Sequence, residues 1–170
     1  MHHVLSVLVR NRAGVLSRIS GLFARRGFNI DSLAVGTTEN PEISRMTIVA
    51  RGDDRLIEQI TKQLYKLIDV VKVQDITDEP FIGRELMLIK VRVTAETRTE
   101  IMDTVLHIFR ARIIDIGADS FIIEATGDPG KVEAMESYLA PFGILEMART
   151  GTVALTRGKK AISGRKGPRS

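Results

Sequence analysis

The spacing of apolar residues in the first 76 positions predicts strands that alternate with two amphipathic helices. The run from Val4 to Val9 is short and rich in β-branched residues, which is typical of a strand. After a turn signal at residues 11–14, four apolar side chains recur on one face of a helix: Val15, Ile19, Leu22 and Phe23. The next expected elements are strands at 29–35 and 43–50, a helix with Ile57, Ile60, Leu64 and Leu67 on its apolar face, and a strand at 70–73. This β-α-β-β-α-β order is typical of the split-βαβ, or ferredoxin-like, arrangement.

The same order of elements repeats in the second half of the chain, without convincing residue identity between the halves. A strand is expected at 85–93, followed by a helix at 98–111 with four inward side chains: Ile101, Val105, Ile108 and Phe109. A hairpin follows at 112–125, and Pro129 is well placed to open a second helix with Val132, Met135 and Leu139 on one face. The stretch 144–155 is expected to close the module as a single strand.

These patterns predict an α+β protein made of two ferredoxin-like βαββαβ modules. The length of 170 residues is compatible with one ordinary domain or two small ones. We expect a first domain at 1–77, a linker at 78–84, a second domain at 85–158 and a basic, mobile tail at 159–170.

The net charge of +4 is concentrated at one end of the chain. Six Lys or Arg residues and no acidic residue lie in positions 156–170, whereas positions 1–155 carry 19 basic and 21 acidic residues. A short Lys/Arg/Gly/Ser end is usually a solvated segment. The charge therefore does not indicate a nucleic-acid partner for the folded modules.

The composition offers little for catalysis. There is no Cys, which excludes a disulfide framework, a Cys-ligated zinc site and a cysteine nucleophile. His2 and His3 are expected to be a frayed polar end, and His107 a surface residue or one satisfied by a hydrogen bond. No Ser, His and carboxylate follow a nucleophile signature, so we expect no catalytic residue and no metal site.

No targeting segment is apparent in the sequence. Its longest uncharged runs stay below the ~18 residues that a membrane span needs, and the start lacks the features of a secretory signal. We therefore expect a cytoplasmic protein that does not enter a membrane.

The loop from Asn11 to Leu16 is the one segment with binding chemistry. Gly14 in the first helical turn leaves space above free backbone N–H groups, which together with the helix dipole favour an anion such as a carboxylate. Asn11 adds an amide donor and acceptor, and Asn29 adds another. Four apolar residues are candidates for a wall: Val7, Val9, Val15 and Leu16. A free amino acid needs such a combination. The alternative is an Asn/Gly turn that only begins a helix.

Seven stretches of the chain follow the pattern of a known family: 10–16, 22–33, 44–48, 59–64, 84–91, 123–127 and 141–144. Through these stretches the sequence resembles the regulatory (small) subunits of acetolactate synthase, also called acetohydroxyacid synthase. The run RRGFNIDSLAVG, at residues 25–36, is highly specific. The resemblance covers roughly residues 2–158 in register.

The resemblance implies an N-terminal ACT domain that pairs as a homodimer and binds valine, or leucine or isoleucine, in the interface. One subunit would offer the loop and the other the start of the second strand. The corresponding positions here are Asn11, Ala13, Gly14, Val15 and Leu16 in the loop, and Asn29 and Ile30 in the strand. All of them match the family pattern.

The resemblance also implies a catalytic partner. The large subunit is a separate chain that uses thiamine diphosphate, FAD and Mg²⁺ to condense 2-oxo acids. The small subunit is not an enzyme and needs no cofactor; it activates the large subunit and transmits feedback inhibition in branched-chain amino acid biosynthesis.

Two other classes of function are alternatives for this chain. A free-standing ACT-type amino-acid sensor would not require the match beyond residue 84. An RNA-binding module of βαββαβ type needs exposed aromatic residues on its central strands, and the strand at 43–49 has none. We therefore expect no nucleic-acid partner.

Overall fold

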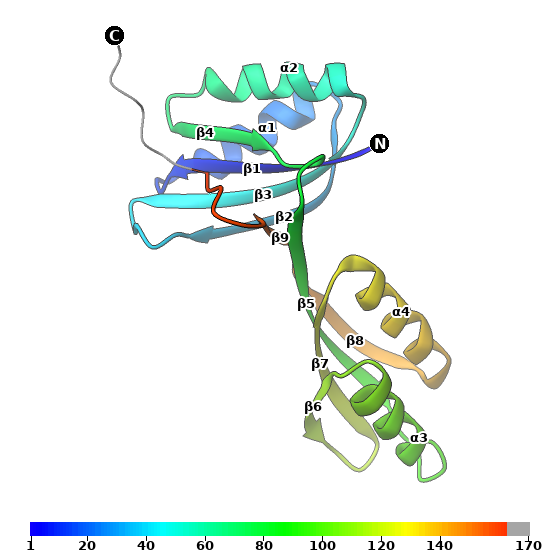
Figure 1. Cartoon of the computed structure of the whole chain (residues 1–170). Helices are drawn as coiled ribbons and strands as arrows, with labels where there is room; N and C mark the ends of the chain where they lie inside the picture. The colour runs from blue at the N-terminus through cyan, green and yellow to red at the C-terminus, as the bar shows by residue number, and fades with distance from the viewer. Residues whose placement is uncertain (163–170) are drawn as a thin grey trace. The chain divides into compact units, whose positions relative to one another are not determined.

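A computed structural model describes residues 1–162 (Figure 1). The chain forms two compact units. Among these residues, the first unit comprises Met1–Ile82 together with residues 152–162, and the second comprises Gly83–Gly151.

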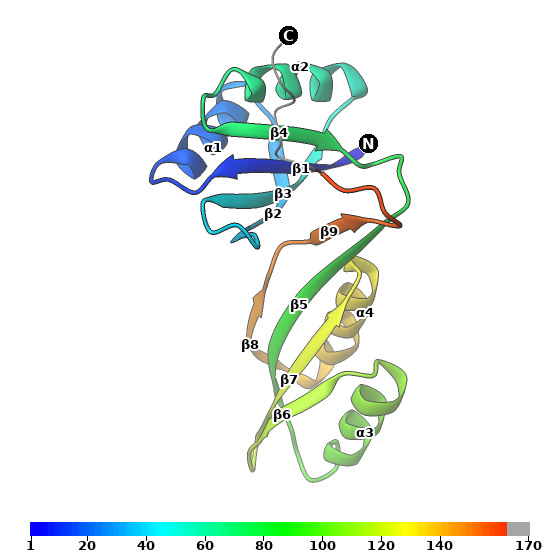
Figure 2. The same cartoon turned by 60° about the vertical axis from the view of Figure 1, so that its left-hand side comes forward.

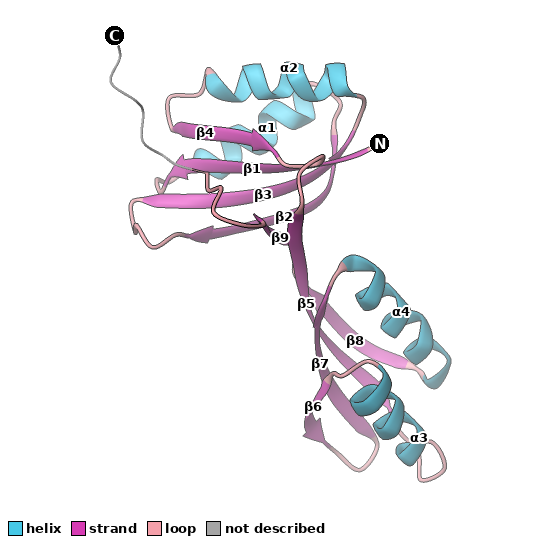
Figure 3. Ribbon diagram, viewed as in Figure 1, coloured by secondary structure: helices cyan, strands magenta, loops and turns pink. Residues whose placement is uncertain are grey.

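The first unit has the predicted βαββαβ order. Its elements are β1 (His2–Arg10), α1 (Val15–Arg25), β2 (Asn29–Thr37), β3 (Ile43–Arg51), α2 (Asp54–Tyr65) and β4 (Val70–Asp75). The strands form an antiparallel sheet in the order β2-β3-β1-β4. Both helices lie on the same face of this sheet (Figure 3). The sheet and its helices are the ferredoxin-like arrangement that the hydrophobic pattern predicts.

The core of the first unit lies between the sheet and the two helices. The predicted inward face of α1 is confirmed, because its four apolar residues are all buried: Val15, Ile19, Leu22 and Phe23. They pack with alternate residues of β1, including Leu5 and Val7. Gly27, with φ of 71°, allows the chain to leave α1 in the left-handed conformation. The Asp53 side chain caps α2 by accepting a hydrogen bond from the Leu56 backbone N–H.

The other face of the same sheet is in contact with the C-terminal part of the chain. Strand β9 (Val153–Thr156) makes one hydrogen bond to the sheet, and Thr152, which precedes it, makes another. Arg45 Nη2 donates to the Ala154 carbonyl at 2.7 Å, and the Thr152 N–H donates to Ser32 Oγ at 2.8 Å. Figure 2 shows β9 beside the sheet of the first unit.

The domain boundaries differ from the expected ones in two places. Residues 152–158 group with the first unit, because their backbone is bonded to Ser32, Arg45 and Pro80 of that unit. The stretch expected as one strand at 144–155 is therefore two strands, β8 (Ile144–Arg149) and β9.

The expected linker at 78–84 is shorter, because β5 (Phe81–Arg92) begins within it. Of the expected tail, Lys160 is ion-paired with Glu79 at 2.7 Å, and residues 163–170 lie outside the described part of the chain.

The second unit repeats the architecture of the first. It contains most of β5, α3 (Arg98–Asp103), a π-helix (Thr104–Ile108), β6 (Arg112–Ile116), β7 (Ser120–Gly127), α4 (Pro129–Leu139), a 3-10 turn (Ala140–Phe142) and β8. Its strands lie in the order β6-β7-β5-β8, the same permutation as in the first unit. The predicted inward residues of α4, namely Val132, Met135 and Leu139, are buried. The two-module α+β architecture is confirmed.

One prediction for the core of the second unit is wrong. Ile108 was expected to face inward but is 74% exposed. The helix changes at Thr104 from α to π, so Phe109 N–H bonds to the carbonyl five residues earlier. The wider turn rotates Ile108 out of the face formed by Ile101 and Val105.

Two absences are observed in the described part of the chain. Within residues 1–162, no helix is long and apolar enough to cross a bilayer. Over the same residues, no group of three or more His, Asp or Glu side chains is arranged to hold a metal ion.

Candidate functional site

The loop between β1 and α1 leaves the start of α1 without a side-chain cap. Gly14 is the N-cap residue and adopts φ of 84° and ψ of −7°, in the left-handed region. No side chain bonds to the first turn and no acidic residue lies in it, whereas α2 and α4 are capped by Asp53 and Asp128. The Val15 N–H donates to the Arg12 carbonyl at 3.4 Å and the Arg18 N–H to the Gly14 carbonyl at 3.0 Å. Within residues 1–162, the N–H groups of Leu16 and Ser17 and the positive end of the dipole are therefore available to an external anion.

Asn11 is fixed at the rim of this loop by the turn that joins β2 to β3. Its side-chain Nδ2 donates to the Pro41 carbonyl at 3.1 Å, and its backbone N–H donates to the Glu42 carbonyl at 2.8 Å. The side chain is exposed and so is Ala13. The polar groups that sequence reasoning placed at the rim are thus at the surface and held in one position.

The apolar residues that were expected to form a wall differ in how exposed they are. Val7, Val9 and Val15 are buried in the core, so these three predicted wall residues offer little surface to a ligand. Leu16 is 46% exposed and remains the apolar side chain of the loop that a ligand can reach.

A charge cluster beside the loop was missed by sequence reasoning. Asp69, just before β4, is 5% exposed, and its Oδ2 lies 2.9 Å from Arg18 Nη2. Its Oδ1 lies 3.8 Å from Arg12 Nη1, and its carbonyl accepts a hydrogen bond from the Arg10 N–H. Asp69 therefore holds arginines before and after Gly14 and fixes the loop. The sequence does contain a signal for this cluster. Asp69 stands between two apolar residues, Ile68 and Val70, and an acidic side chain is rarely buried unless it is paired.

The other predicted residues, Asn29 and Ile30, lie at the opposite end of the sheet. Asn29 pairs with Arg51 of β3, which pairs with His2 at the start of β1, whereas the loop follows the end of β1. A strand of nine residues spans roughly 26 Å at 3.3 Å per residue. The structure therefore does not bring the two predicted groups together within one chain.

The end of the sheet at which Asn29 lies is polar. Asn29 Nδ2 donates to Asp31 Oδ1 at 2.8 Å, and Asp31 Oδ2 lies 3.3 Å from Arg51 Nε and 3.0 Å from His2 Nδ1. Ile30 is partly buried and packs against the core. The Asn29 amide is thus positioned by a surface network on β2 and β3.

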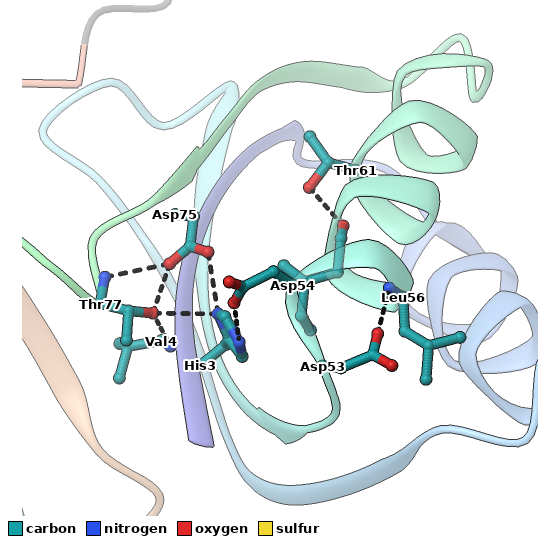
Figure 4. A network of polar contacts seen from close by, with 9 residues as sticks. His3, Val4, Asp53, Asp54, Leu56, Thr61, Asp75 and Thr77 are labelled. Atoms are coloured by element: carbon teal, nitrogen blue, oxygen red, sulfur yellow. Dashed lines mark hydrogen bonds and ion pairs between the residues drawn. The ribbon is translucent and has the colours of Figure 1, made fainter. Parts of the chain in front are cut away.

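His3 is buried, contrary to the expectation of a frayed end (Figure 4). Its Nδ1 lies 3.0 Å from Asp75 Oδ2, and its Nε2 lies 3.3 Å from Asp54 Oδ1. Asp75 also accepts hydrogen bonds from the backbone and side chain of Thr77. The network joins β1, the start of α2 and the end of β4, and this long-range packing is what buries the imidazole.

The Asp75 carboxyl makes the stability of the first unit depend on pH. Burial alone raises its pKa, but hydrogen bonds from Thr77 and His3 outweigh burial and hold the pKa below its usual range. The folded chain then binds this proton less tightly than the unfolded chain, so the contribution is present above the unfolded pKa of about 3.9 and is lost as the pH falls through the folded pKa. We expect Asp75→Asn to lower the free energy of unfolding by about 1 kcal/mol at pH 7, and by clearly less at pH 3.

Urea denaturation of the wild-type chain and the variant at both pH values measures this difference. Asp54→Asn is the matched control, because Asp54 contacts the same imidazole but its side chain is 85% exposed. Its effect should stay below about 0.5 kcal/mol. An Asp75→Asn effect of equal size at pH 7 and pH 3 would contradict the assignment.

Comparison with known proteins identifies both units. A family model for the ACT domain of acetohydroxyacid synthase small subunits matches residues 5–72, and a model described as the small subunit of acetolactate synthase matches residues 84–158. A probable acetolactate synthase small subunit of Archaeoglobus fulgidus is 56% identical over 160 residues, covering 94% of this chain and 99% of the relative. This chain belongs to the acetolactate synthase small-subunit family.

Further relatives support the same membership. The acetolactate synthase small subunit of Mycolicibacterium smegmatis is 51% identical over 164 residues, covering 96% of each chain. The crystal structure of the acetolactate synthase small subunit of Thermotoga maritima aligns with a TM-score of 0.86 at 45% identity, over 94% of this chain and 99% of that one. The family membership supports the role of a regulatory subunit and identifies the first unit as an ACT domain.

Proposed function

We propose that this chain activates a separate catalytic subunit of acetolactate synthase and transmits feedback inhibition by valine. The catalytic subunit would carry thiamine diphosphate, FAD and Mg²⁺. Valine would bind between the ACT domains of two copies of this chain, with Asn11, Ala13, Gly14, Val15 and Leu16 from one copy and Asn29 and Ile30 from the other.

The single observation that supports a shared site is the separation of these two groups of residues. A valine molecule is far smaller than the roughly 26 Å between the ends of β1. A ligand that touches both groups therefore has to touch two chains.

The edge of the sheet supports a way to bring the two groups together. Among the described residues, β2 pairs only with β3, so its other edge is free to pair with a second copy. If two β2 strands pair antiparallel about a twofold axis, Asn29 of one chain comes toward Thr37 of the other. Thr37 leads into the turn whose Pro41 and Glu42 carbonyls bind Asn11. The symmetry would then create two equivalent sites.

The loop can meet the charged end of an amino acid. The uncapped start of α1 and the Asn11 amide provide donors for the carboxylate, and Leu16 contacts the apolar side chain. The Asn29 amide oxygen provides an acceptor for the ammonium group. Valine bound across two chains favours one dimer geometry, and that preference is what shifts the catalytic subunit toward its inhibited state.

Isothermal titration calorimetry of the full chain with valine, leucine and isoleucine, alone and with the catalytic subunit, tests this function. We expect valine to bind. The catalytic subunit should change the affinity of this chain for valine by about 5- to 150-fold, and valine should change the affinity of this chain for the catalytic subunit by the same factor. An apolar pocket separates ligands that differ by one methylene by only about 10- to 200-fold, so all three amino acids should show measurable binding.

The same titrations separate this role from that of a free-standing sensor. A sensor of another target would bind the amino acid with an affinity that the catalytic subunit leaves unchanged. No heat with any of the three amino acids, in either state, would contradict effector binding itself.

A further inference from the structure

A cavity of about 790 Å³ lies entirely within the first unit. It lies between the face of the sheet that is opposite to α1 and α2, the β2–β3 turn and the chain at residues 155–162, and it is open to solvent on one side. Apolar side chains form much of its wall: Leu8, Ile43, Ile76, Leu155 and Ile162. The volume is in the range of small-molecule sites, roughly 300–1,000 Å³. None of the residues proposed for valine lines it.

Arg45 gives this cavity a positive charge that lacks a counter-ion. Its Nη2 donates to Ser6 Oγ at 2.8 Å and to the Ala154 carbonyl at 2.7 Å, and both acceptors are neutral. Within residues 1–162, Arg45 forms no ion pair, and its buried Nε has no hydrogen-bond partner. Burial also lowers the pKa of its guanidinium group. A partly desolvated cation without an anion is unfavourable, so this position favours an external anion.

The rim of the cavity adds to this positive charge. Lys159 and Lys160 line it, against a single acidic residue, Glu39. Lys160 is engaged by Glu79 at 2.7 Å, whereas Lys159 is exposed. The field at the opening therefore attracts a negatively charged ligand.

We propose that this cavity binds a small organic monoanion with an apolar body. Its carboxylate would lie on the Arg45 guanidinium, and its hydrocarbon part would contact Ile43, Leu155 and Ile162, the apolar lining residues that are not fully buried. A purely polar anion such as phosphate would leave these walls unfilled and would lose the apolar contribution. The proposal does not depend on valine binding or on the catalytic partner.

Titration calorimetry of the full chain tests the site with a series of straight-chain carboxylates. The probes are acetate, butyrate and hexanoate, with hexanamide as the neutral match and inorganic phosphate as the polar anion. We expect affinity to rise about three- to fourfold for each added methylene. Hexanamide should bind at least tenfold more weakly than hexanoate, and phosphate should not bind. Hexanoate binding should persist in saturating valine.

Variants of charged residues connect the binding to this cavity. Arg45→Met should weaken hexanoate at least tenfold, whereas Arg45→Lys, which keeps the charge, should retain part of the affinity. Lys159→Glu reverses an exposed charge at the rim without touching the core and should weaken binding several-fold. Arg51→Met is the matched control on the same strand, since Arg51 pairs with Asp31 at the other end of the sheet and should have no effect.

Several results would overturn the proposal. They are equal affinities for hexanoate and hexanamide, phosphate binding as tight as hexanoate, displacement of hexanoate by valine, or no effect of Lys159→Glu. If thermal unfolding shows that Arg45→Met does not fold, Arg45→Lys and Lys159→Glu decide the matter.

Discussion

Replacing Gly14 with aspartate is expected to abolish inhibition by valine while activation of the catalytic subunit persists. Gly14 lies at the uncapped start of α1, where the valine carboxylate is proposed to bind. An aspartate there places a second carboxylate at the same N–H groups, and two like charges in contact cost several kcal/mol. We expect the valine concentration for half inhibition to rise at least about 100-fold, which corresponds to roughly 2.7 kcal/mol. Activity of the reconstituted enzyme over a range of valine concentrations measures the effect.

Gly14→Asn is the matched control for this substitution. Asparagine has nearly the same shape as aspartate without its charge, and it tolerates the left-handed conformation that Gly14 adopts, with φ of 84°. An added Cβ at Gly14 meets only Arg18 Nη2, at 3.8 Å, so the space is available. The asparagine variant should keep much more valine sensitivity than the aspartate variant. Full sensitivity in Gly14→Asp would exclude this loop as the binding site.

Mixing two valine-insensitive variants is expected to restore part of the valine response. Asn11→Ala removes the loop side of the proposed site and Asn29→Ala removes the strand side, so each variant alone should lose binding. In a mixed dimer, one site combines the intact loop of one chain with the intact strand of the other. Random exchange makes half of the dimers mixed, so about one quarter of all sites should be restored, as twofold symmetry requires. Calorimetric titration of the exchanged mixture counts these sites.

The control for this experiment is a mixture made without subunit exchange, which should bind no valine. A double variant that carries both substitutions, exchanged with itself, should also bind none. If the exchanged mixture of single variants binds no valine although each variant folds normally, the two asparagines do not belong to one shared site.

Most of the fold follows from patterns that are local in the sequence. The four inward residues of α1, the Asp53 cap of α2 and the inward face of α4 are set by neighbours within a few positions. The exception, Ile108, shows the limit of this reasoning. A period of 3.6 residues was assumed, and the π turn at Thr104–Ile108 breaks it.

The donor groups of the loop at residues 11–16 could be predicted from the sequence, whereas the geometry of this loop could be predicted only in part. The loop sequence predicts an anion-binding helix start, and α1 indeed lacks a cap. The role of Asp69 could not be predicted, because its partners Arg12 and Arg18 are more than fifty residues away in the chain. The burial of His3 was missed for the same reason, since it depends on the pairing of β1 with β4 and on the start of α2.

The sequence by itself determined the two βαββαβ modules and the family, and it supplied the residues that we propose for an amino-acid site. The tertiary structure decided where those residues lie, because the distance between Asn11 and Asn29 depends on the order and direction of strands that are distant in sequence. It also decided that residues 152–162 return to the first unit and line a cavity that contains Arg45. Local periodicity reflects contacts between near neighbours, whereas burial of a single charged or polar side chain depends on every element that packs against it.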